Sequence, residues 1–477
     1  MRISVIGCGY LGAVHAACMA ELGHEVVGVD VDATKVGLLS RGRAPFHEPG
    51  FEVMLARNVE ARRLRFTTDF AEAGSAEVHF IGVGTPQLAS GYGADLSFVD
   101  AAVESLVPHL TAQPHGRTLV VGKSTVPVGT ADRFADRIAP TGALLVWNPE
   151  FLREGFAVAD TLSPDRIVYG LPDEPTDAQY ARVKLDAVYA DLLARQIPRL
   201  LMDYVTAELV KVAANSFLAT KISFINAMAE LCEATGADVT KLAEAIGHDD
   251  RIGPKFLRAG IGFGGGCLPK DIRAFMARAG ELGVDEALTF LREVDAINNR
   301  RRDHAVELAR QALGGAFVGR RVAVLGAAFK PDSDDMRNSP ALEVAARIAG
   351  EGALVTITDP AAGPALRAQR PWVTVADDAQ SAAVDADLVM LLTEWKEFRD
   401  LDPETLGAVV THRSIIDGRN VLDPARRRLD LPRNRTTLGT TATAAGRTNR
   451  IPPEWTPPLE KVPICRPVEF RPVPERA

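Results

Sequence analysis

The start of the chain constrains the fold most, because it holds a complete glycine turn between a predicted strand and a predicted helix. A short run rich in β-branched residues at 2–6 is followed by GCGYLG at residues 7–12 and by an alanine-rich stretch to Leu22. In a dinucleotide-binding βαβ unit, the first glycine makes the turn, the second admits the pyrophosphate and the third lets helix and strand pack closely. Gly7, Gly9 and Gly12 hold these positions, so a dinucleotide-binding domain is predicted. A glycine turn in another α/β fold is the alternative.

The end of the second predicted strand indicates which dinucleotide binds. Residues 25–29 are followed by Asp30, which stands 18 residues after Gly12. A carboxylate at this place accepts hydrogen bonds from the ribose hydroxyls and would repel a 2′-phosphate, which favours NAD over NADP. Lys35 is near enough in the sequence to reach the same ribose.

Further apolar runs predict a parallel sheet. Residues 78–83, 118–121 and 144–147 are apolar and are separated by helical stretches. Ligands of such sheets bind beyond the carboxyl ends of the strands. The loops that follow these runs contain Thr85, Thr125 and Glu154, which become candidate site residues. Ordinary loop chemistry or helix capping is the alternative for each.

One long helix is predicted over Met202–Thr235, since this stretch contains no proline or glycine and ends before Gly236. Lys211 and Asn215 are four residues apart and therefore share a face of this helix. A lysine and an asparagine directed at one point can stabilise an oxyanion. A solvated polar stripe is the alternative.

The chemistry is predicted at the glycine-rich segment 260–271. Five glycines precede Cys267, and Pro269, Lys270 and Asp271 follow it. Glycine allows positive φ and close approach of the backbone to a ligand. Pro269 suits the first position of a helix, so Cys267 is expected near a helix N-terminus beside a lysine, where the thiolate is favoured. Cys267 is thus the predicted nucleophile, and a buried structural cysteine is the alternative.

A second α/β unit is predicted after residue 320. Apolar runs at 321–326, 353–358, 388–393 and 414–417 alternate with helical stretches, and the first turn lacks the three glycines. Three cations near the predicted strand ends suit a phosphorylated ligand, although exposed surface cations are commoner. They are Lys330, Arg337 and Arg419.

The predicted fold class is therefore α/β, with two Rossmann-like doubly wound parallel-sheet domains joined by a long central helix and a small helical domain. We expect an NAD-binding domain at 1–200, a central helical domain with the catalytic Lys, Asn and Cys at 201–300, and a Rossmann-like nucleotide-sugar domain at 315–435. Residues 436–477 bear Pro, Thr and Arg without periodicity and are expected to be a disordered tail.

Composition excludes several classes of partner. The net charge of −8 gives no general attraction to nucleic acid or to an anionic membrane. The five cysteines form no zinc-like spacing, so no metal site is expected, and they fit a reducing compartment. The chain starts without a secretory pattern and contains no run of about 18 apolar residues, so a cytoplasmic protein is expected.

Taken together, the motifs resemble the UDP-glucose 6-dehydrogenases within the UDP-glucose/GDP-mannose dehydrogenase family, from Met1 to about Asn420. The resemblance rests on residues 7–12, 84–86, 124–130, 148–155, 251–253, 262–267, 269–271, 329–331 and 417–420. It implies NAD bound to the first domain, a homodimer formed through the long helix and a nucleotide sugar, UDP-glucose before others, bound to the last domain. The implied reaction oxidises the sugar C6 alcohol to a carboxylate with two NAD.

The resemblance also implies roles for individual residues. The implied catalytic residues are Cys267, Lys211, Asn215, Asp271, Glu154 and Thr125. The implied NAD contacts are Gly7, Gly9, Tyr10, Leu11, Gly12, Asp30, Lys35, Thr85, Thr125, Glu154, Lys270 and Arg337. The implied substrate contacts are Phe151, Leu152, Arg153, Glu154, Lys211, Asn215, Arg251, Phe256, Leu257, Arg258, Ala259, Gly260, Gly264, Lys330 and Arg419, with Arg251 reaching the site of the partner subunit.

This sequence departs from the family pattern on both sides of the nucleophile. Gly266 stands where the family usually has Ser or Ala, and Leu268 stands where it has Phe. The tail after residue 436 has no recognised counterpart.

Two other classes of function stay open. A β-hydroxyacid dehydrogenase would transfer one hydride and would need neither Cys267 nor a third domain, and a non-catalytic nucleotide-sugar or NAD binder would transfer none. Two NADH per substrate distinguish the predicted reaction from both. The sugar and base are also open among dTDP-glucose, UDP-N-acetyl sugars and GDP-mannose, and so is the carboxylate that acts as base in each step.

Overall fold

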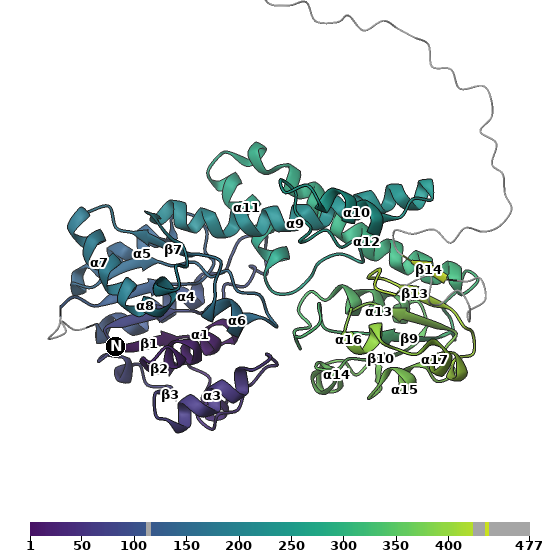
Figure 1. Ribbon diagram of the computed structural model, residues 1–477, viewed down its shortest axis with the longest axis horizontal. Helices are drawn as coiled ribbons and strands as arrows, with labels where there is room; N and C mark the ends of the chain where they lie inside the picture. Colours follow the sequence, from purple (N-terminus) through teal and green to yellow (C-terminus); the bar gives the residue numbers. More distant parts are fainter. Residues whose placement is uncertain (111–115, 423–434, 438–477) are drawn as a thin grey trace, which may run out of the picture. The chain divides into compact units, whose positions relative to one another are not determined.

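The computed structural model describes residues 1–110, 116–422 and the backbone of 435–437. Figure 1 shows three α/β or helical regions that follow one another along the chain, and the tail predicted at 436–477 lies almost wholly outside the described residues. Its first residues are an exception, because 435–437 pair with a sheet of the third region. The three regions follow one another in the order that the predicted fold class requires. The two sheets confirm that fold class.

The first region is an eight-stranded sheet with the order β3-β2-β1-β4-β5-β6-β7-β8. Its strands are β1 (Arg2–Ile6), β2 (Glu25–Val29), β3 (Leu64–Thr67), β4 (Val78–Ile81), β5 (Leu119–Gly122), β6 (Leu144–Trp147), β7 (Ile167–Leu171) and β8 (Arg199–Asp203). The first six are parallel, as predicted, whereas β7 pairs with β6 in the antiparallel sense. Strands β7 and β8 are parallel to each other, and their reversed direction relative to the first six strands was not foreseen from the sequence.

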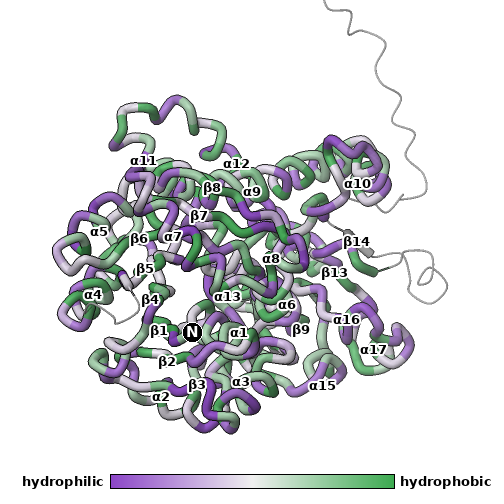
Figure 2. Tube along the Cα trace, turned by 60° about the vertical axis from the view of Figure 1, so that its left-hand side comes forward, coloured by the Kyte–Doolittle hydropathy of each residue, from purple (hydrophilic) through white to green (hydrophobic). Residues whose placement is uncertain are grey.

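Helices cover both faces of this sheet and bury two apolar layers against it. They are α1 (Tyr10–Glu21), α2 (Ala33–Leu39), α3 (Phe51–Glu60), α4 (Ser97–Leu106), α5 (Thr130–Ile138), α6 (Ala157–Leu162), α7 (Pro175–Val188) and α8 (Ala190–Ala194), with short 3₁₀ helices η1 (Phe70–Ala73), η2 (Val107–His109) and η3 (Ala139–Thr141). Figure 2 shows hydrophobic residues gathered in the strands between these helices, which is the burial expected of a doubly wound sheet.

The central region consists of α9 (Tyr204–Thr235), α10 (Val239–Gly247), α11 (Leu268–Glu281), η4 (Asp285–Leu288) and α12 (Phe290–Ala312). The predicted start of the long helix was wrong by two residues, because Met202 belongs to β8 and the Asp203 side chain caps the helix by accepting a hydrogen bond from Thr206 N. The helix ends, as predicted, before Gly236, whose φ is 77°. Helices α11 and α12 pack along α9 around a small apolar core.

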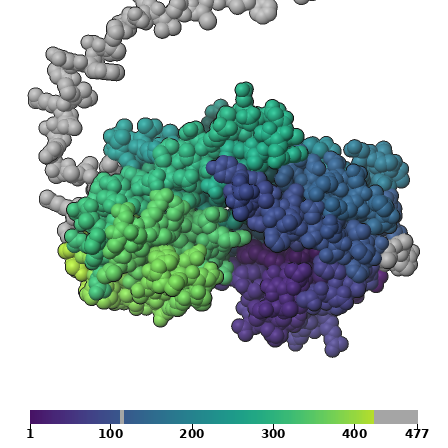
Figure 3. Space-filling model, turned by 180° about the vertical axis from the view of Figure 1, so that it is seen from behind, coloured from purple at the N-terminus to yellow at the C-terminus, as the bar shows by residue number. Residues whose placement is uncertain are grey.

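The third region is a six-stranded parallel sheet with the order β11-β10-β9-β12-β13-β14. Its strands are β9 (Arg321–Leu325), β10 (Leu354–Thr358), β11 (Thr374–Val375), β12 (Leu388–Leu391), β13 (Ile415–Asp417) and β14 (Arg435–Thr437), and its helices are α13 (Pro340–Gly350), α14 (Gly363–Gln369), α15 (Ala379–Ala383), α16 (Lys396–Arg399) and α17 (Pro403–Val409). On the face seen in Figure 3, this region (green) borders the first one (purple and blue).

The turn after β9 differs from the turn after β1 in a way that bears on ligand choice. The buried Asp359 carboxylate accepts the N–H groups of Ala327 and Ala328 at 2.7 and 2.9 Å, and its second oxygen accepts those of residues 361 and 362. Helix α13 begins only at Pro340, with the Ser339 side chain as its cap. The third region therefore lacks a glycine turn that leads straight into a helix N-terminus, which is the feature that binds pyrophosphate.

Candidate active site

The three glycines of the first turn face different surroundings. Gly7 has φ +88°, and a Cβ there would lie 2.4 Å from Val83 Cγ1. A Cβ at Gly12 would lie 1.8 Å from the carbonyl oxygen of Gly7, while a Cβ at Gly9 would meet no atom within 4 Å. Gly9 thus borders open space at the N-terminus of α1, which no side chain caps. An anionic pyrophosphate fits this place.

Asp30 is buried and lies beside this turn. Its carboxylate accepts the N–H of Cys8 at 2.7 Å and a charged hydrogen bond from Lys35 Nζ at 2.9 Å. Lys35 therefore neutralises Asp30 as well as lying where a ribose would bind. The second Asp30 oxygen accepts the Asp32 N–H and Lys35 Nζ, each at 3.0 Å. A ribose hydroxyl would compete with Lys35 for this oxygen, and a buried carboxylate beside the glycine turn fits NAD.

Thr85 and Thr125, which follow β4 and β5, come together as the parallel topology requires. The Thr85 hydroxyl donates to the Thr125 carbonyl at 2.7 Å, and Lys270 Nζ lies 3.4 Å from Thr85 Oγ1. Both threonines, Lys270 and Asp271 line one pocket between these loops and α11. The pocket thereby joins the end of the first sheet to the helix that follows Cys267.

Asp271 is held by two of the other candidates. Its buried carboxylate accepts hydrogen bonds from Asn215 Nδ2 at 2.6 Å and from Lys270 Nζ at 2.5 Å. The Asn215 amide has a second N–H that this bond does not use, so Asn215 can donate both to Asp271 and to a substrate oxygen. Lys211, one turn earlier on α9, has its ammonium 5.5 Å from the centre of the Phe151 ring.

Cys267 is the N-cap of α11, because the helix begins at Leu268 and Pro269 takes its second position rather than the first. Although solvent reaches the side chain, burial of the sulfur among protein atoms raises the pKa of the thiol, and Asp271 raises it further. Lys211 and Lys270 act in the opposite direction but are outweighed. The prediction of a favoured thiolate is therefore wrong for this arrangement, because dehydration exceeds the effect of the two lysines.

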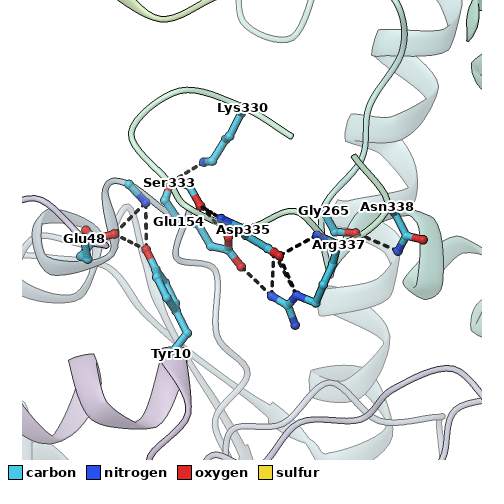
Figure 4. A network of polar contacts seen from close by, with 10 residues as sticks. Tyr10, Glu48, Glu154, Gly265, Lys330, Ser333, Asp335, Arg337 and Asn338 are labelled. Carbon is cyan, nitrogen blue, oxygen red and sulfur yellow. Dashed lines mark hydrogen bonds and ion pairs between the residues drawn. The ribbon is translucent and has the colours of Figure 1, made fainter. Parts of the chain in front are cut away.

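Glu154 is buried at the contact between the first and third regions (Figure 4). Its carboxylate accepts hydrogen bonds from Ser333 Oγ at 3.3 Å and Arg337 Nη2 at 3.2 Å, and its carbonyl oxygen accepts from Lys330 Nζ. Burial, followed by the neighbouring Asp335 carboxylate, raises the pKa of Glu154 to about 7. A carboxyl group of this pKa exchanges protons readily near neutral pH, which suits a general base.

The glycine-rich segment packs against protein. Added Cβ atoms would overlap Gly418 O at Gly260, Asn298 Oδ1 at Gly262, Asn338 O at Gly264 and the Phe329 ring at Gly265, at 2.2–2.8 Å. The segment is therefore rich in glycine because α12 and the third region press on it. Arg419, buried at the same contact, donates to Gly262 O at 3.0 Å and to Leu392 O at 2.8 Å.

Arg337 explains why this chain has glycine at position 266, where the family pattern usually has Ser or Ala. A Cβ at this position would lie 2.6–2.8 Å from the Arg337 guanidinium. Glycine here lets Arg337 lie directly over the residue before Cys267. Leu268, the other departure, packs into the small core beside α11.

Some of residues 256–260, which lead into the glycine-rich segment, are buried close to α9. Leu257, Ala259 and Gly260 are buried, whereas Arg258 is exposed. Phe256 has φ +64°, and Gly260 N–H donates to Asn226 Oδ1 at 2.8 Å. These contacts connect α9 to the start of the glycine-rich segment.

Three predicted contacts point elsewhere in this chain. Arg251 is 89% exposed and pairs with Asp249 at 2.6 Å. Arg153 pairs with Asp160 at 2.7 Å. The Tyr10 hydroxyl donates to Glu48, so this end of the side chain lies against the Glu154 loop and not in the cofactor turn. Leu11 packs beside Gly82, and Phe151 and Leu152 pack against the two core layers.

Sequence reasoning missed Glu150 and Lys123. Glu150 accepts the N–H groups of Phe151 and Leu152 at 2.7 and 2.8 Å and pairs with Lys123 Nζ at 3.2 Å. Burial opposes its ionisation, but Lys123 and Lys211 outweigh burial and lower the pKa of Glu150. The signal was present, because both residues stand directly after predicted strands of the same sheet edge.

Among the described residues, no group of three or more His, Cys, Asp or Glu side chains could hold a metal ion. Within the same residues, none of the helices has the length and apolar character needed to cross a membrane.

The fold and site define a class: a dinucleotide-dependent oxidoreductase with a cysteine beside a buried carboxylate and a second Rossmann-like domain. Models of three domains of the UDP-glucose/GDP-mannose dehydrogenase family match the chain: the NAD binding domain at residues 1–193, the central domain at 205–300 and the UDP binding domain at 323–424. The chain belongs to this family and is an NAD-dependent oxidoreductase.

Named relatives and solved structures agree with this family. The chain is 42% identical over 426 residues to a UDP-glucose 6-dehydrogenase of Rhizobium meliloti, covering 88% of this chain and 95% of that one. It is 41% identical over 441 residues to a UDP-glucose 6-dehydrogenase of Pseudomonas aeruginosa, with 89% and 95% covered. The structure of a UDP-glucose dehydrogenase from Pyrobaculum islandicum matches with a TM-score of 0.82 at 38% identity, covering 92% and 98%.

Proposed function

We propose that this enzyme oxidises the C6 alcohol of UDP-glucose to the carboxylate of UDP-glucuronate, with two NAD and with Cys267 as covalent nucleophile. The observation that carries the proposal is the grouping of Cys267 with Asp271, Asn215 and Lys270 at the junction of α9 and α11. A reaction that transferred one hydride would need no thiol at this place. The names of the relatives support UDP-glucose over other nucleotide sugars.

The chain's own residues account for the first oxidation. NAD, when bound at the first turn, accepts the hydride in each of the two oxidations. The C6 hydroxyl loses its proton to a base, Lys211 or a water held by Asp271, and C6 loses a hydride, which leaves the aldehyde. The Cys267 sulfur then bonds to the aldehyde carbon while the carbonyl oxygen takes up a proton, which gives a thiohemiacetal. Lys211 and Asn215 stabilise the negative charge that develops on that oxygen.

The second oxidation and the hydrolysis that follows it yield the carboxylate product. Loss of a hydride and a proton from the thiohemiacetal gives a thioester on Cys267. Water then adds to the thioester carbon, the C–S bond breaks and the sulfur leaves. We assign the base of this step to Glu154, because its raised pKa lets it accept a proton from water near neutral pH. Asp271, fixed by Asn215 and Lys270, serves the earlier proton transfer.

Lys330, Arg337 and Arg419 form the proposed diphosphate side of the site. They come from the third region and converge on the Glu154 loop and the glycine-rich segment. In this structure they donate to protein carbonyls and carboxylates. A nucleotide diphosphate offers the same guanidinium and ammonium groups a more highly charged acceptor.

We also propose a homodimer formed through α9 and β8. Leu209, Phe217, Phe224 and Leu231 are 36%, 68%, 49% and 57% exposed, and the last three recur every seven residues on one face of the helix. A stripe of this kind is covered in a stable soluble protein. Arg251, exposed in this chain, would then be free to reach the partner's site. The free cysteines of the described chain suit the cytoplasmic location that we propose.

Stoichiometry tests the proposal most directly. Purified enzyme should form two NADH per UDP-glucose consumed, with UDP-glucuronate as the product by mass spectrometry. One NADH per substrate would favour a simple alcohol oxidation, and none would favour a binding protein. Comparison of kcat/KM for UDP-glucose, dTDP-glucose, UDP-N-acetyl sugars and GDP-mannose would test the choice of substrate.

A further inference from the structure

Glu48 is a buried carboxylate that stands outside every motif used so far. It lies just before α3 and is 6% exposed. One of its oxygens accepts the Gly155 N–H at 2.7 Å and the Tyr10 hydroxyl, and the other lies 3.4 Å from Val158 N. Figure 4 shows this carboxylate in contact with both the Tyr10 hydroxyl and the loop that carries Glu154. Glu48 thus connects the N-terminus of the cofactor-binding helix to the loop of the proposed base.

The peptide group between Glu154 and Gly155 is held at both ends. Its N–H donates to Glu48 at 2.7 Å and also to the Tyr10 hydroxyl oxygen at 2.9 Å, and its C=O accepts from Lys330 of the third region. Gly155 has φ +75°, and a Cβ there would lie 2.6 Å from the Asp332 carbonyl oxygen, so the backbone is also confined on the far side. Because the Glu154 side chain leaves the backbone next to this peptide, the orientation of the peptide decides where its carboxylate points.

We propose that Glu48 is a positioning residue that holds the Glu154–Gly155 peptide and so directs the Glu154 carboxylate at the thioester during hydrolysis. Its hydrogen bond to Tyr10 links that orientation to the turn that receives the cofactor. The inference rests on the proposed function, since it assigns Glu48 to the step in which Glu154 acts as base. Glu48 is not a catalytic residue, because it contacts other protein groups.

The contacts require a carboxylate of this length. Two donors, Gly155 N–H and the Tyr10 hydroxyl, converge on one oxygen, and an ionised acceptor binds both better than a neutral one. Glutamine offers one acceptor oxygen and places an NH₂ group where the other oxygen accepts. Aspartate keeps the charge but is shorter by one CH₂ group, so it cannot reach Gly155 from the same backbone position.

The variants Glu48→Gln and Glu48→Asp test the proposal, with Glu154→Gln as the comparison. In rapid-quench experiments with NAD and UDP-glucose, both Glu48 variants should hydrolyse the acyl-enzyme roughly tenfold or more slowly, the effect of losing a buried charge-assisted hydrogen bond. The first hydride transfer and the NAD Kd should stay within about threefold of wild type. Mass spectrometry should show acyl-enzyme accumulating at residue 267, as in Glu154→Gln.

A matched control and a second variant separate positioning from general damage. Glu52→Gln changes an exposed carboxylate of the neighbouring helix that pairs with Arg43, and it should leave every step unchanged. Tyr10→Phe removes one donor to Glu48 and should slow the same hydrolysis step by a smaller factor. If Glu48→Gln does not fold, Tyr10→Phe carries the same measurement.

Two results would overturn the inference. One is an equal slowing of both hydride transfers and hydrolysis, which marks a purely structural role; the other is normal hydrolysis in a folded Glu48→Gln. Hydrogen exchange of the Gly155 amide gives a readout that needs no turnover. This amide should exchange faster in Glu48→Gln, and an unchanged exchange rate would refute the proposal that Glu48 holds the Glu154–Gly155 peptide. Wild-type enzyme that forms no acyl-enzyme from any nucleotide sugar would instead refute the proposed function.

Discussion

Cys267 faces two opposing demands at the residue scale. In the proposed mechanism it must be reached by the substrate aldehyde, and it must ionise in order to attack. Burial and Asp271 raise the pKa of its thiol. Lys211 and Lys270 oppose this effect and so reduce the free-energy cost of forming the thiolate when the sulfur attacks.

Cys267→Ser should separate the two oxidations. The first hydride transfer needs no thiol, whereas serine, with its far higher pKa, captures the aldehyde slowly and forms an ester that hydrolyses more slowly than a thioester. Steady-state NADH production should fall by about 10³-fold or more while NAD and UDP-glucose still bind. Mass spectrometry of the mixed enzyme would detect an adduct at residue 267. Turnover at the wild-type rate would exclude a covalent mechanism.

Glu154 should impose a pH dependence on hydrolysis. Because burial and Asp335 raise the pKa of Glu154 to about 7, the base loses its ionised form as the pH falls through that value. The rate constant for acyl-enzyme hydrolysis, followed by rapid quench, should then decrease about tenfold per pH unit at lower pH. Glu154→Gln should abolish this dependence and lower the rate constant about 10²-fold. A titrating limb that persists in the variant would move the base to another carboxylate.

At the scale of elements, α9 does more than join domains. Glu208, one turn before Lys211, is 2% exposed and accepts the N–H groups of Gly129 and Ala131 at the N-terminus of α5, each at 2.7 Å. The carboxylate therefore fastens the helix that carries the site to the loop that contains Thr125. Burial raises the pKa of Glu208 to about 7 in spite of these bonds.

Glu208 should make stability fall as the pH rises. Its folded-state pKa of about 7 exceeds the ordinary value of 4.5, so its contribution is complete below pH 4.5 and is lost as the pH rises through 7. Glu208→Gln removes this titration. Urea denaturation at pH 5 and pH 7.5 should show a smaller loss of stability in the variant, by on the order of 2 kcal/mol. An equal loss in both proteins would mean that another group titrates.

Local patterns predicted the elements well and their contacts poorly. Strands β1, β2 and β6 have the predicted bounds, because each is a short apolar run closed by a turn or a charged residue. Glu48 and Glu208 could not be predicted, since a lone glutamate reveals its partners only after distant loops are brought together. The glycine-rich segment shows the same limit, because its crowding was attributed to a ligand and is due to α12 and the third region.

At the scale of the whole molecule, the exposed stripe on α9 makes assembly testable. Phe224→Glu places a charge within the proposed interface and should convert dimer to monomer in sedimentation velocity at micromolar concentration. Val183→Glu, at an equally exposed apolar position on α7, is the control and should stay dimeric. A wild-type protein that sediments as a monomer would contradict the proposed interface.

Removal of residues 441–477 should leave kcat nearly unchanged, because this stretch follows the last motif and lacks periodicity. Steady-state kinetics of the truncated chain beside the full chain would measure the effect. A large decrease in kcat would place part of the tail in the site.

The turn after β9 bears on the order of events in the proposed reaction. Helix α13 begins well after this turn and is capped by Ser339. Among the described residues, the first turn therefore offers the one glycine turn that leads straight into a helix N-terminus, while the proposed reaction consumes two NAD. The first NADH must therefore depart, and a fresh NAD must enter, before the second oxidation. During this exchange the half-oxidised sugar is a reactive aldehyde. In the proposed mechanism, the covalent bond of this sugar to Cys267 and the contacts of its nucleotide with the third region keep the intermediate bound while the cofactor is replaced.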